Sequence, residues 1–183
     1  MTKNKIIMAL KALNKKLAAQ GCKAEICLYG GTAMVLAFNA RLSTEDVDAV
    51  FRPKDAVRIA AESLADELGL KSDWLNDGVK GFLSRKGKFT AEDLPQFSNI
   101  QITRPTASYL LAMKCIAARA PGYDTRGDRT DIIFLMKELK IGTAAKALDL
   151  VEEYYPRERI LPKTQFMILE CLAEIKNEQE GRA

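Results

Sequence analysis

The fold is decided by Leu28-Tyr29-Gly30-Gly31-Thr32, together with the acidic stretch Glu45-Asp46-Val47-Asp48-Ala49-Val50 that follows it. In the first stretch, apolar residues lead into two glycines with a hydroxyl residue behind them. Glycine permits a positive φ and lets backbone N–H groups approach an anion closely. The pattern therefore predicts a strand that ends in a tight, phosphate-accepting turn, although a glycine pair alone also fits an ordinary strand-to-helix turn.

The acidic stretch predicts a second strand with two carboxylates on one face. Asp46 and Asp48 flank a valine in apolar surroundings, and residues i and i+2 of a strand point to the same side of a sheet. Two hard oxygen ligands side by side suit Mg²⁺ or Mn²⁺, with substrate phosphates and water as further ligands. An exposed strand edge is the alternative for the acids alone. A phosphate turn followed by a carboxylate pair indicates metal-assisted transfer of a nucleotidyl group.

Hydrophobic spacing along the rest of the chain predicts an α+β fold. Helices are expected at 6–17, 32–40, 54–68, 74–83, 105–119, 128–139, 143–154 and 163–176, and strands at 24–29, 47–51 and 99–103. Loops are expected at 89–98 and 121–127, and a frayed end at 177–183. The expected architecture is one domain, with a small mixed sheet flanked by helices in residues 1–104 and a helical portion in 105–176.

The composition is that of an ordinary folded domain. The chain has 183 residues, of which 48% are hydrophobic and 28% charged, enough for a buried core and unlike a disordered chain. No apolar run approaches the roughly 20 residues of a membrane helix, and the start of the chain lacks the apolar region of a secretory signal. The net charge of +4 is compatible with a nucleotide or RNA substrate and argues for neither.

The sequence contains no histidine and four scattered cysteines. Ser-His-Asp and Cys-His catalysis are therefore excluded, which leaves acid–base and metal chemistry to carboxylates and lysines. Cys22, Cys27, Cys115 and Cys171 lack the C-x-x-C spacing of a structural zinc site. They are interpreted as reduced, partly buried residues of a cytoplasmic protein, with a Cys22–Cys27 disulfide as the alternative for the first pair.

These motifs resemble the polymerase-β-like nucleotidyltransferase superfamily. Gly30-Gly31-Thr32 followed by Arg41-Leu42-Ser43-Thr44-Glu45-Asp46-Val47-Asp48 is similar to its G-G/S…D-x-D signature. The continuation is most similar to bacterial and archaeal nucleotidyltransferases related to the AbiEii abortive-infection toxins. Leu111-Ala112-Met113-Lys114-Cys115-Ile116-Ala117-Ala118-Arg119 is similar to a family helix that carries a lysine and an arginine. Asp128-Arg129-Thr130-Asp131-Ile132 is similar to the D-x-x-D helix that follows it.

The resemblance implies a nucleotidyltransferase-type sheet and a nucleotide site. It implies that the nucleotide is bound by Gly30, Gly31, Thr32, Arg41 and Ser43. Thr32 alternatively caps the next helix. Gly31→Val is expected to remove nucleotide binding from a folded domain, because a branched side chain disfavours a positive φ and blocks approach to the backbone.

The resemblance also implies catalytic roles. Asp46 and Asp48 would bind Mg²⁺ or Mn²⁺, and Lys114 would balance phosphate charge. Lys114 alternatively extends along the core edge, because it shares a helix face with apolar residues. Lys114→Met is expected to lose activity and to keep its thermal stability. Of Asp128 and Asp131, at i and i+3, one is implied to be catalytic, and the alternative is stabilisation of a first helical turn.

One departure from the family pattern concerns the metal site. Many members carry a third carboxylate on a later strand, whereas the expected strand 99–103 offers Gln101 and no acid. The leading interpretation is a metal-dependent nucleotidyltransferase that moves an NMP from an NTP to a hydroxyl of a tRNA 3′ end, a protein or a small molecule. The resemblance further implies a toxin with a cognate antitoxin. The alternatives are an inactive nucleotide-binding module with the same fold and a purely structural domain.

Overall fold

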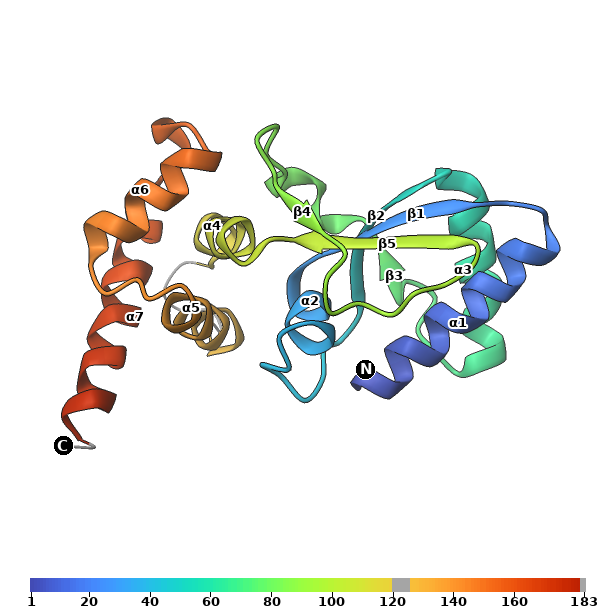
Figure 1. Cartoon of the computed structure of the whole chain (residues 1–183), viewed down its shortest axis with the longest axis horizontal. Helices are drawn as coiled ribbons and strands as arrows, with labels where there is room; N and C mark the ends of the chain where they lie inside the picture. The colour runs from blue at the N-terminus through green and yellow to red at the C-terminus, as the bar shows by residue number, and fades with distance from the viewer. Residues whose placement is uncertain (120–125, 182–183) are drawn as a thin grey trace. The chain divides into compact units, whose positions relative to one another are not determined.

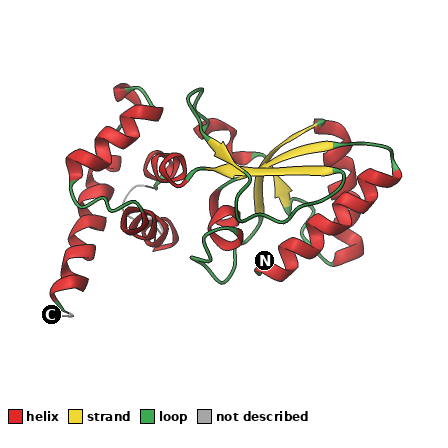
Figure 2. Cartoon of the chain, viewed as in Figure 1, coloured by secondary structure: helices red, strands yellow, loops and turns green. Residues whose placement is uncertain are grey.

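The chain adopts an α+β fold in the computed structural model, which describes residues 1–119 and 126–181 (Figures 1 and 2). The N-terminal part holds a mixed five-stranded sheet with helices, and the C-terminal half is helical, so the predicted fold class is confirmed. The chain divides into two compact units. We call Met1–Gly81 with Phe89–Pro105 the sheet unit, and Phe82–Lys88 with Thr106–Ala183 the helical unit. The single predicted domain stays a prediction.

The elements labelled in Figure 1 have the following bounds. The chain up to Pro105 forms α1 (Lys3–Ala19), β1 (Ala24–Leu28), α2 (Gly30–Leu36), β2 (Val47–Arg52), α3 (Lys54–Leu68), β3 (Leu75–Asn76), the 3₁₀ helix η1 (Gly78–Phe82), β4 (Phe89–Thr90) and β5 (Ile100–Pro105). It continues with α4 (Ala107–Ala117), α5 (Arg126–Glu138), α6 (Ala144–Tyr154), the 3₁₀ helix η2 (Arg157–Arg159) and α7 (Pro162–Glu180).

The sheet is mixed, with its strands in the order β3-β2-β1-β5-β4. β1 runs antiparallel to β2 and parallel to β5, β2 runs parallel to β3, and β4 runs antiparallel to β5. In the centre, Cys27 lies opposite Val50 on one side and Thr103 on the other. Because side chains alternate along a strand, these three residues share one face of the sheet. Their neighbours in the chain share the other face.

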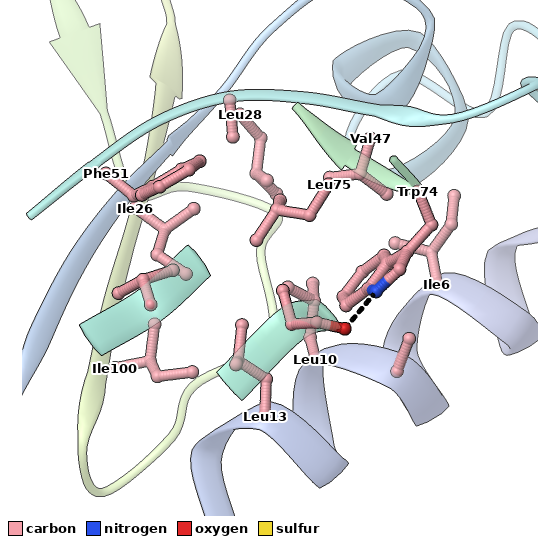
Figure 3. Packing of buried hydrophobic residues seen from close by; sticks show 14 of the residues in the cluster. Ile6, Leu10, Leu13, Ile26, Leu28, Val47, Phe51, Trp74, Leu75 and Ile100 are labelled. Atoms are coloured by element: carbon pink, nitrogen blue, oxygen red, sulfur yellow. Dashed lines mark hydrogen bonds between the residues drawn. The ribbon is translucent and has the colours of Figure 1, made fainter. Parts of the chain in front are cut away.

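That other face is covered by the hydrophobic core of the sheet unit (Figure 3). Its strand residues are buried, namely Ala24, Ile26, Leu28, Val47, Ala49, Phe51, Ile100 and Ile102. Apolar residues of α1 and α3 belong to the same cluster, among them Ile6, Leu10, Leu13, Val57, Ala60 and Leu64. Asp48 lies between two of these buried strand residues, so alternation directs it to the opposite face, away from the core.

Helix ends coincide with residues suited to capping. Thr106 and Thr143 precede α4 and α6, and their hydroxyl oxygens accept hydrogen bonds from Tyr109 N and Lys146 N. These bonds satisfy N–H groups that lack a partner within the helix. Gly69 ends α3 in the left-handed region, with φ +59°, a conformation that glycine adopts without strain.

Tyrosine side chains connect the elements of the helical unit. The rings of Tyr109 and Tyr154 stack with their centroids 5.0 Å apart. Tyr109 Oη accepts from Ser84 N over 2.8 Å, and Tyr155 Oη donates to Phe82 O over 2.5 Å. An unpaired buried hydroxyl would cost about 1–3 kcal/mol of folding free energy. These bonds therefore explain how tyrosines are accommodated in the core and why the segment Phe82–Lys88 packs with the helices.

The structure corrects the sequence prediction between α3 and α4. Residues 74–83 were predicted to be one helix, but they form β3 and η1, because Leu75–Asn76 pairs with β2. The loop predicted at 89–98 contains the short strand β4. Pro105 ends β5 instead of opening α4, since Thr106 is the capping residue of that helix.

Other element ends also differ from the prediction. α2 begins at the glycine pair itself and ends at Leu36, short of the predicted end at residue 40. α7 continues to Glu180, so the tail predicted to be frayed from residue 177 is helical up to that point. The loop predicted at 121–127 lies, up to residue 125, outside the described residues, and α5 begins at Arg126.

The cysteines are all free thiols, so the alternative Cys22–Cys27 disulfide is not formed. Cys115 and Cys171 are buried, and burial raises the pKa of both thiols. A thiol with a raised pKa holds little thiolate and reacts slowly. In the part of the chain that the structure describes, no helix has the length and apolar character needed to cross a membrane.

Candidate functional site

The glycine turn lies where β1 ends and α2 begins. Tyr29 N donates to Asp48 O over 2.9 Å, which extends the pairing of β1 with β2 by one residue. Gly30 has φ +53°, whereas Gly31 is outside the left-handed region. The expected positive φ at Gly31 is therefore wrong, and Gly30 is the residue whose backbone requires glycine.

Asp48 lies directly against Gly30. A Cβ atom at Gly30 would be 2.6 Å from Asp48 Oδ2, which is closer than van der Waals contact permits. The carboxylate therefore occupies the space that a side chain at position 30 would fill. The two stretches that decide the fold meet at this point of the sheet unit.

Gly31 is buried beside the loop that leads into β2. A Cβ atom at Gly31 would overlap Thr44 Oγ1 and would lie 3.6 Å from Arg41 Nη1. A guanidinium group is thus placed beside the glycine turn. Gly31→Val would collide with Thr44, so the expectation that this variant affects only nucleotide binding does not hold. Ser43 is exposed, and its backbone forms an antiparallel bridge with Thr2.

Thr32 supports the backbone at Asp46, the residue that precedes β2. Its side chain is fully buried, and Thr32 Oγ1 donates to Asp46 O over 3.1 Å. This hydrogen bond holds the backbone immediately before β2. A hydrogen bond from Thr32 to phosphate stays a prediction.

Asp46 is held by Asn76, a residue that sequence reasoning did not single out. Asn76 Nδ2 donates to Asp46 Oδ2 over 2.7 Å, and in the pairing of β2 with β3, Asn76 lies opposite Asp48. The sequence did not predict this contact, because residues 74–83 were expected to form a helix and not a strand beside β2. A two-residue strand leaves no periodic pattern in the sequence, so no signal placed Asn76 beside an acid 30 positions earlier.

The carboxylates of Asp46 and Asp48 fit a divalent cation. Both residues are half-buried, and their oxygens are the hard donors that Mg²⁺ and Mn²⁺ prefer. A cation held by this pair would draw its further ligands from phosphate and water, as Mg²⁺ does in nucleotide sites. Within residues 1–119 and 126–181, no group of three or more Asp, Glu, Cys or His side chains is arranged to hold a metal ion.

Lys114 and two aspartates form a charge cluster inside the helical unit. Lys114 Nζ lies 2.7 Å from Asp131 Oδ2 and 3.7 Å from Asp128 Oδ1. Arg119 Nε lies 3.8 Å from Asp128 Oδ2. The side chain of Asp131 is fully buried, and that of Lys114 is 11% exposed. The α4 and α5 motifs therefore meet, and both aspartates contact the lysine.

This cluster overturns the expected stability of Lys114→Met. Removing one partner of a buried ion pair leaves an uncompensated charge, which typically costs about 3–5 kcal/mol. Lys114 also differs from a lysine that merely extends along the core edge, because its ammonium group is paired with a buried carboxylate.

Comparisons of the chain with protein-family models, with curated proteins and with solved structures found no match.

Gly30→Ala is expected to displace Asp48 and to destabilise the sheet unit. A left-handed backbone costs a non-glycine residue about 1–2 kcal/mol, and the new Cβ would also collide with Asp48 Oδ2. Gly69→Ala is the matched control, because Gly69 has φ +59° and no atom within 4 Å of its Cβ position. Urea denaturation should show the larger loss for Gly30→Ala. Equal losses would contradict the close approach of Asp48 to the turn.

Proposed function

We propose that the protein is a metal-dependent nucleotidyltransferase that moves an NMP from an NTP to a hydroxyl acceptor. The observation that supports this most directly is the position of the Asp48 carboxylate, which fills the space beside Gly30. Asp46 lies two residues earlier and is held by Asn76. A glycine turn that lets backbone N–H groups approach an anion, next to two hard oxygen donors, suits a nucleotide and its cation together.

Each group of the sheet unit has a separate role in this proposal. The backbone N–H groups of the Gly30–Gly31 turn are proposed to donate to the triphosphate, and Arg41 beside Gly31 supplies positive charge. Asp46 and Asp48 hold Mg²⁺ or Mn²⁺, which when bound neutralises charge on the phosphates. Transfer of this kind depends mostly on positioning and charge stabilisation, which is consistent with a chain that contains no histidine.

The role proposed for Lys114 is to balance phosphate charge, as the family resemblance implies. Its ammonium group is held by Asp131 and Asp128. A cation fixed in advance stabilises developing charge without having to rearrange during the reaction. Asp128 and Asp131 are accordingly proposed to position the lysine.

The proposed substrates are an NTP and an acceptor hydroxyl on RNA, such as a tRNA 3′ end, or on a protein. The net charge of +4 is compatible with an RNA acceptor. The cytoplasm is the proposed location. The resemblance to AbiEii-related toxins adds a cognate antitoxin as the proposed partner.

A second candidate function is an inactive nucleotide-binding module with the same fold. One observation favours it: β5 presents Gln101 and Thr103 on the sheet face to which Asp48 points, and neither is acidic. A third acid on such a strand is what many members of the resembled superfamily carry. The two candidates predict the same nucleotide binding and differ in transfer.

Incubation with each NTP, labelled on its α-phosphate, tests the proposal. Total RNA and total protein serve as acceptors, with Mg²⁺, with Mn²⁺ or with a chelator. We expect metal-dependent transfer of label to one acceptor class. Nucleotide binding without transfer would support the inactive module, and absence of both binding and transfer for every NTP would contradict both candidates.

A further inference from the structure

Asn76 connects the acidic pair to the turn that follows β3. Its Nδ2 donates to Asp46 Oδ2 over 2.7 Å, and its Oδ1 accepts from Gly78 N over 3.0 Å. The second bond fixes the orientation of the carboxamide, because the oxygen must face the backbone N–H. The nitrogen must then face Asp46, so Asn76 acts toward the carboxylate as a donor only.

The backbone around Asn76 is held by hydrogen bonds and strand pairing. Val47 N donates to Trp74 O over 2.7 Å, and Asn76 lies opposite Asp48 in the pairing of β3 with β2. Trp74 is 1% exposed, and its Nε1 donates to Ala61 O over 2.9 Å, shown by the dashed line in Figure 3. This indole anchors the short strand on α3. The carboxamide is therefore presented to Asp46 from a fixed position.

The contact also fixes the carboxylate of Asp46. Oδ2 accepts a hydrogen bond from the amide, which holds the carboxylate of Asp46 in one orientation. Outer residues of this kind orient the ligands of metal sites, and their loss typically lowers metal affinity or activity by about 10–100-fold.

We propose that Asn76 is a positioning residue for the metal site, and that it orients Asp46 for cation binding next to Asp48. This inference rests on the proposed function. It assigns to a neutral amide on β3 the task of organising a site in which β5 supplies no acid. Asn76 itself contacts neither the cation nor the nucleotide in this proposal.

Mn²⁺ titration followed by electron paramagnetic resonance tests the proposal without relying on activity, because bound and free Mn²⁺ give different signals. The proteins compared are wild type, Asn76→Ala, Asp48→Asn and Asn14→Ala. Asn14 is the matched control, since its carboxamide also bridges two groups, Ser98 Oγ and Asn99 N, at a site remote in the sequence from the acids. Thermal denaturation of each variant reports its folding.

We expect Asn76→Ala to weaken Mn²⁺ binding by about 10–100-fold and to need correspondingly more Mn²⁺ for transfer. Asn14→Ala should bind Mn²⁺ as wild type does. Recovery of transfer at high Mn²⁺, in a variant whose thermal denaturation without metal matches that of wild type, would support positioning, because folding is then intact before metal is added. Wild-type Mn²⁺ affinity in folded Asn76→Ala would overturn the role of Asn76 alone. A wild-type protein that binds no Mn²⁺ would overturn the proposed function and this inference together.

Discussion

Asp48→Asn is expected to remove the metal dependence of nucleotide binding and to lower transfer by about 10²–10³-fold, the usual effect of losing one strong electrostatic contact in an active site. The substitution keeps the shape of the side chain that packs against Gly30, so the turn should stay in place. It removes the negative charge and replaces one carboxylate oxygen, a donor that a divalent cation prefers, by an amide nitrogen. Calorimetric titration with each NTP, with and without Mg²⁺, measures the binding effect.

The matched control for this variant is Asp66→Asn, which makes the same change of charge at an exposed position of α3. Its nucleotide affinity and transfer rate should equal those of wild type. If wild type binds nucleotide equally well with and without metal, or if Asp48→Asn transfers at the wild-type rate, the metal role of Asp48 is contradicted.

Lys114→Met is expected to lower the free energy of unfolding by about 3–5 kcal/mol, because it leaves the buried carboxylate of Asp131 without its cation. Transfer should also fall by about 10²–10³-fold if the ammonium group stabilises phosphate charge. Such a group acts mainly in the transition state, so kcat should fall more than KM rises. Guanidinium denaturation and steady-state kinetics measure the two effects separately.

Two comparisons separate these effects. Lys137→Met is the control, because it removes an exposed ion pair between α5 and Glu178 of α7. Surface pairs contribute only about 0–1 kcal/mol to the free energy of unfolding. The double variant Lys114→Met/Asp131→Asn leaves no uncompensated charge at this pair, so it should regain a large part of the stability while remaining inactive. Full transfer by the double variant would show that the lysine serves the fold alone.

The sequence predicted the elements that have strong local signals. The strands around Ile26, Val47 and Ile102 were found because apolar and polar residues alternate or because an apolar run is bounded by turn residues. The helix 54–68 was found with both ends, because Pro53 precedes it and Gly69 supplies the left-handed residue that ends it. These features depend on neighbouring residues only.

Contacts between distant residues were predicted only where two motifs were interpreted together. The order of the glycine pair and the acids indicated a common site, and Asp48 does lie against Gly30. The pairing of Asn76 with Asp46 depends on a strand too short to leave a pattern. The pairing of Lys114 with Asp131 makes the lysine important for stability. The sequence did not predict this pairing, because helical spacing shows which face of a helix is apolar and not which charged residue lies opposite it.

Residues that alternate along β2 should be under different selection: the core-facing residues for folding, and Asp48 on the opposite face for function. Truncating Phe51 to alanine would open a cavity in the core at a typical cost of about 3–5 kcal/mol, which lowers the amount of folded protein in a cell. Under the proposed function, replacing Asp48 on the opposite face should change chemistry far more than folding, so a descendant would lose catalysis and keep its architecture. A mutational scan of β2 should record abundance and transfer separately. We expect abundance to fall mainly at the core-facing positions, and transfer alone to fall mainly at the positions between them.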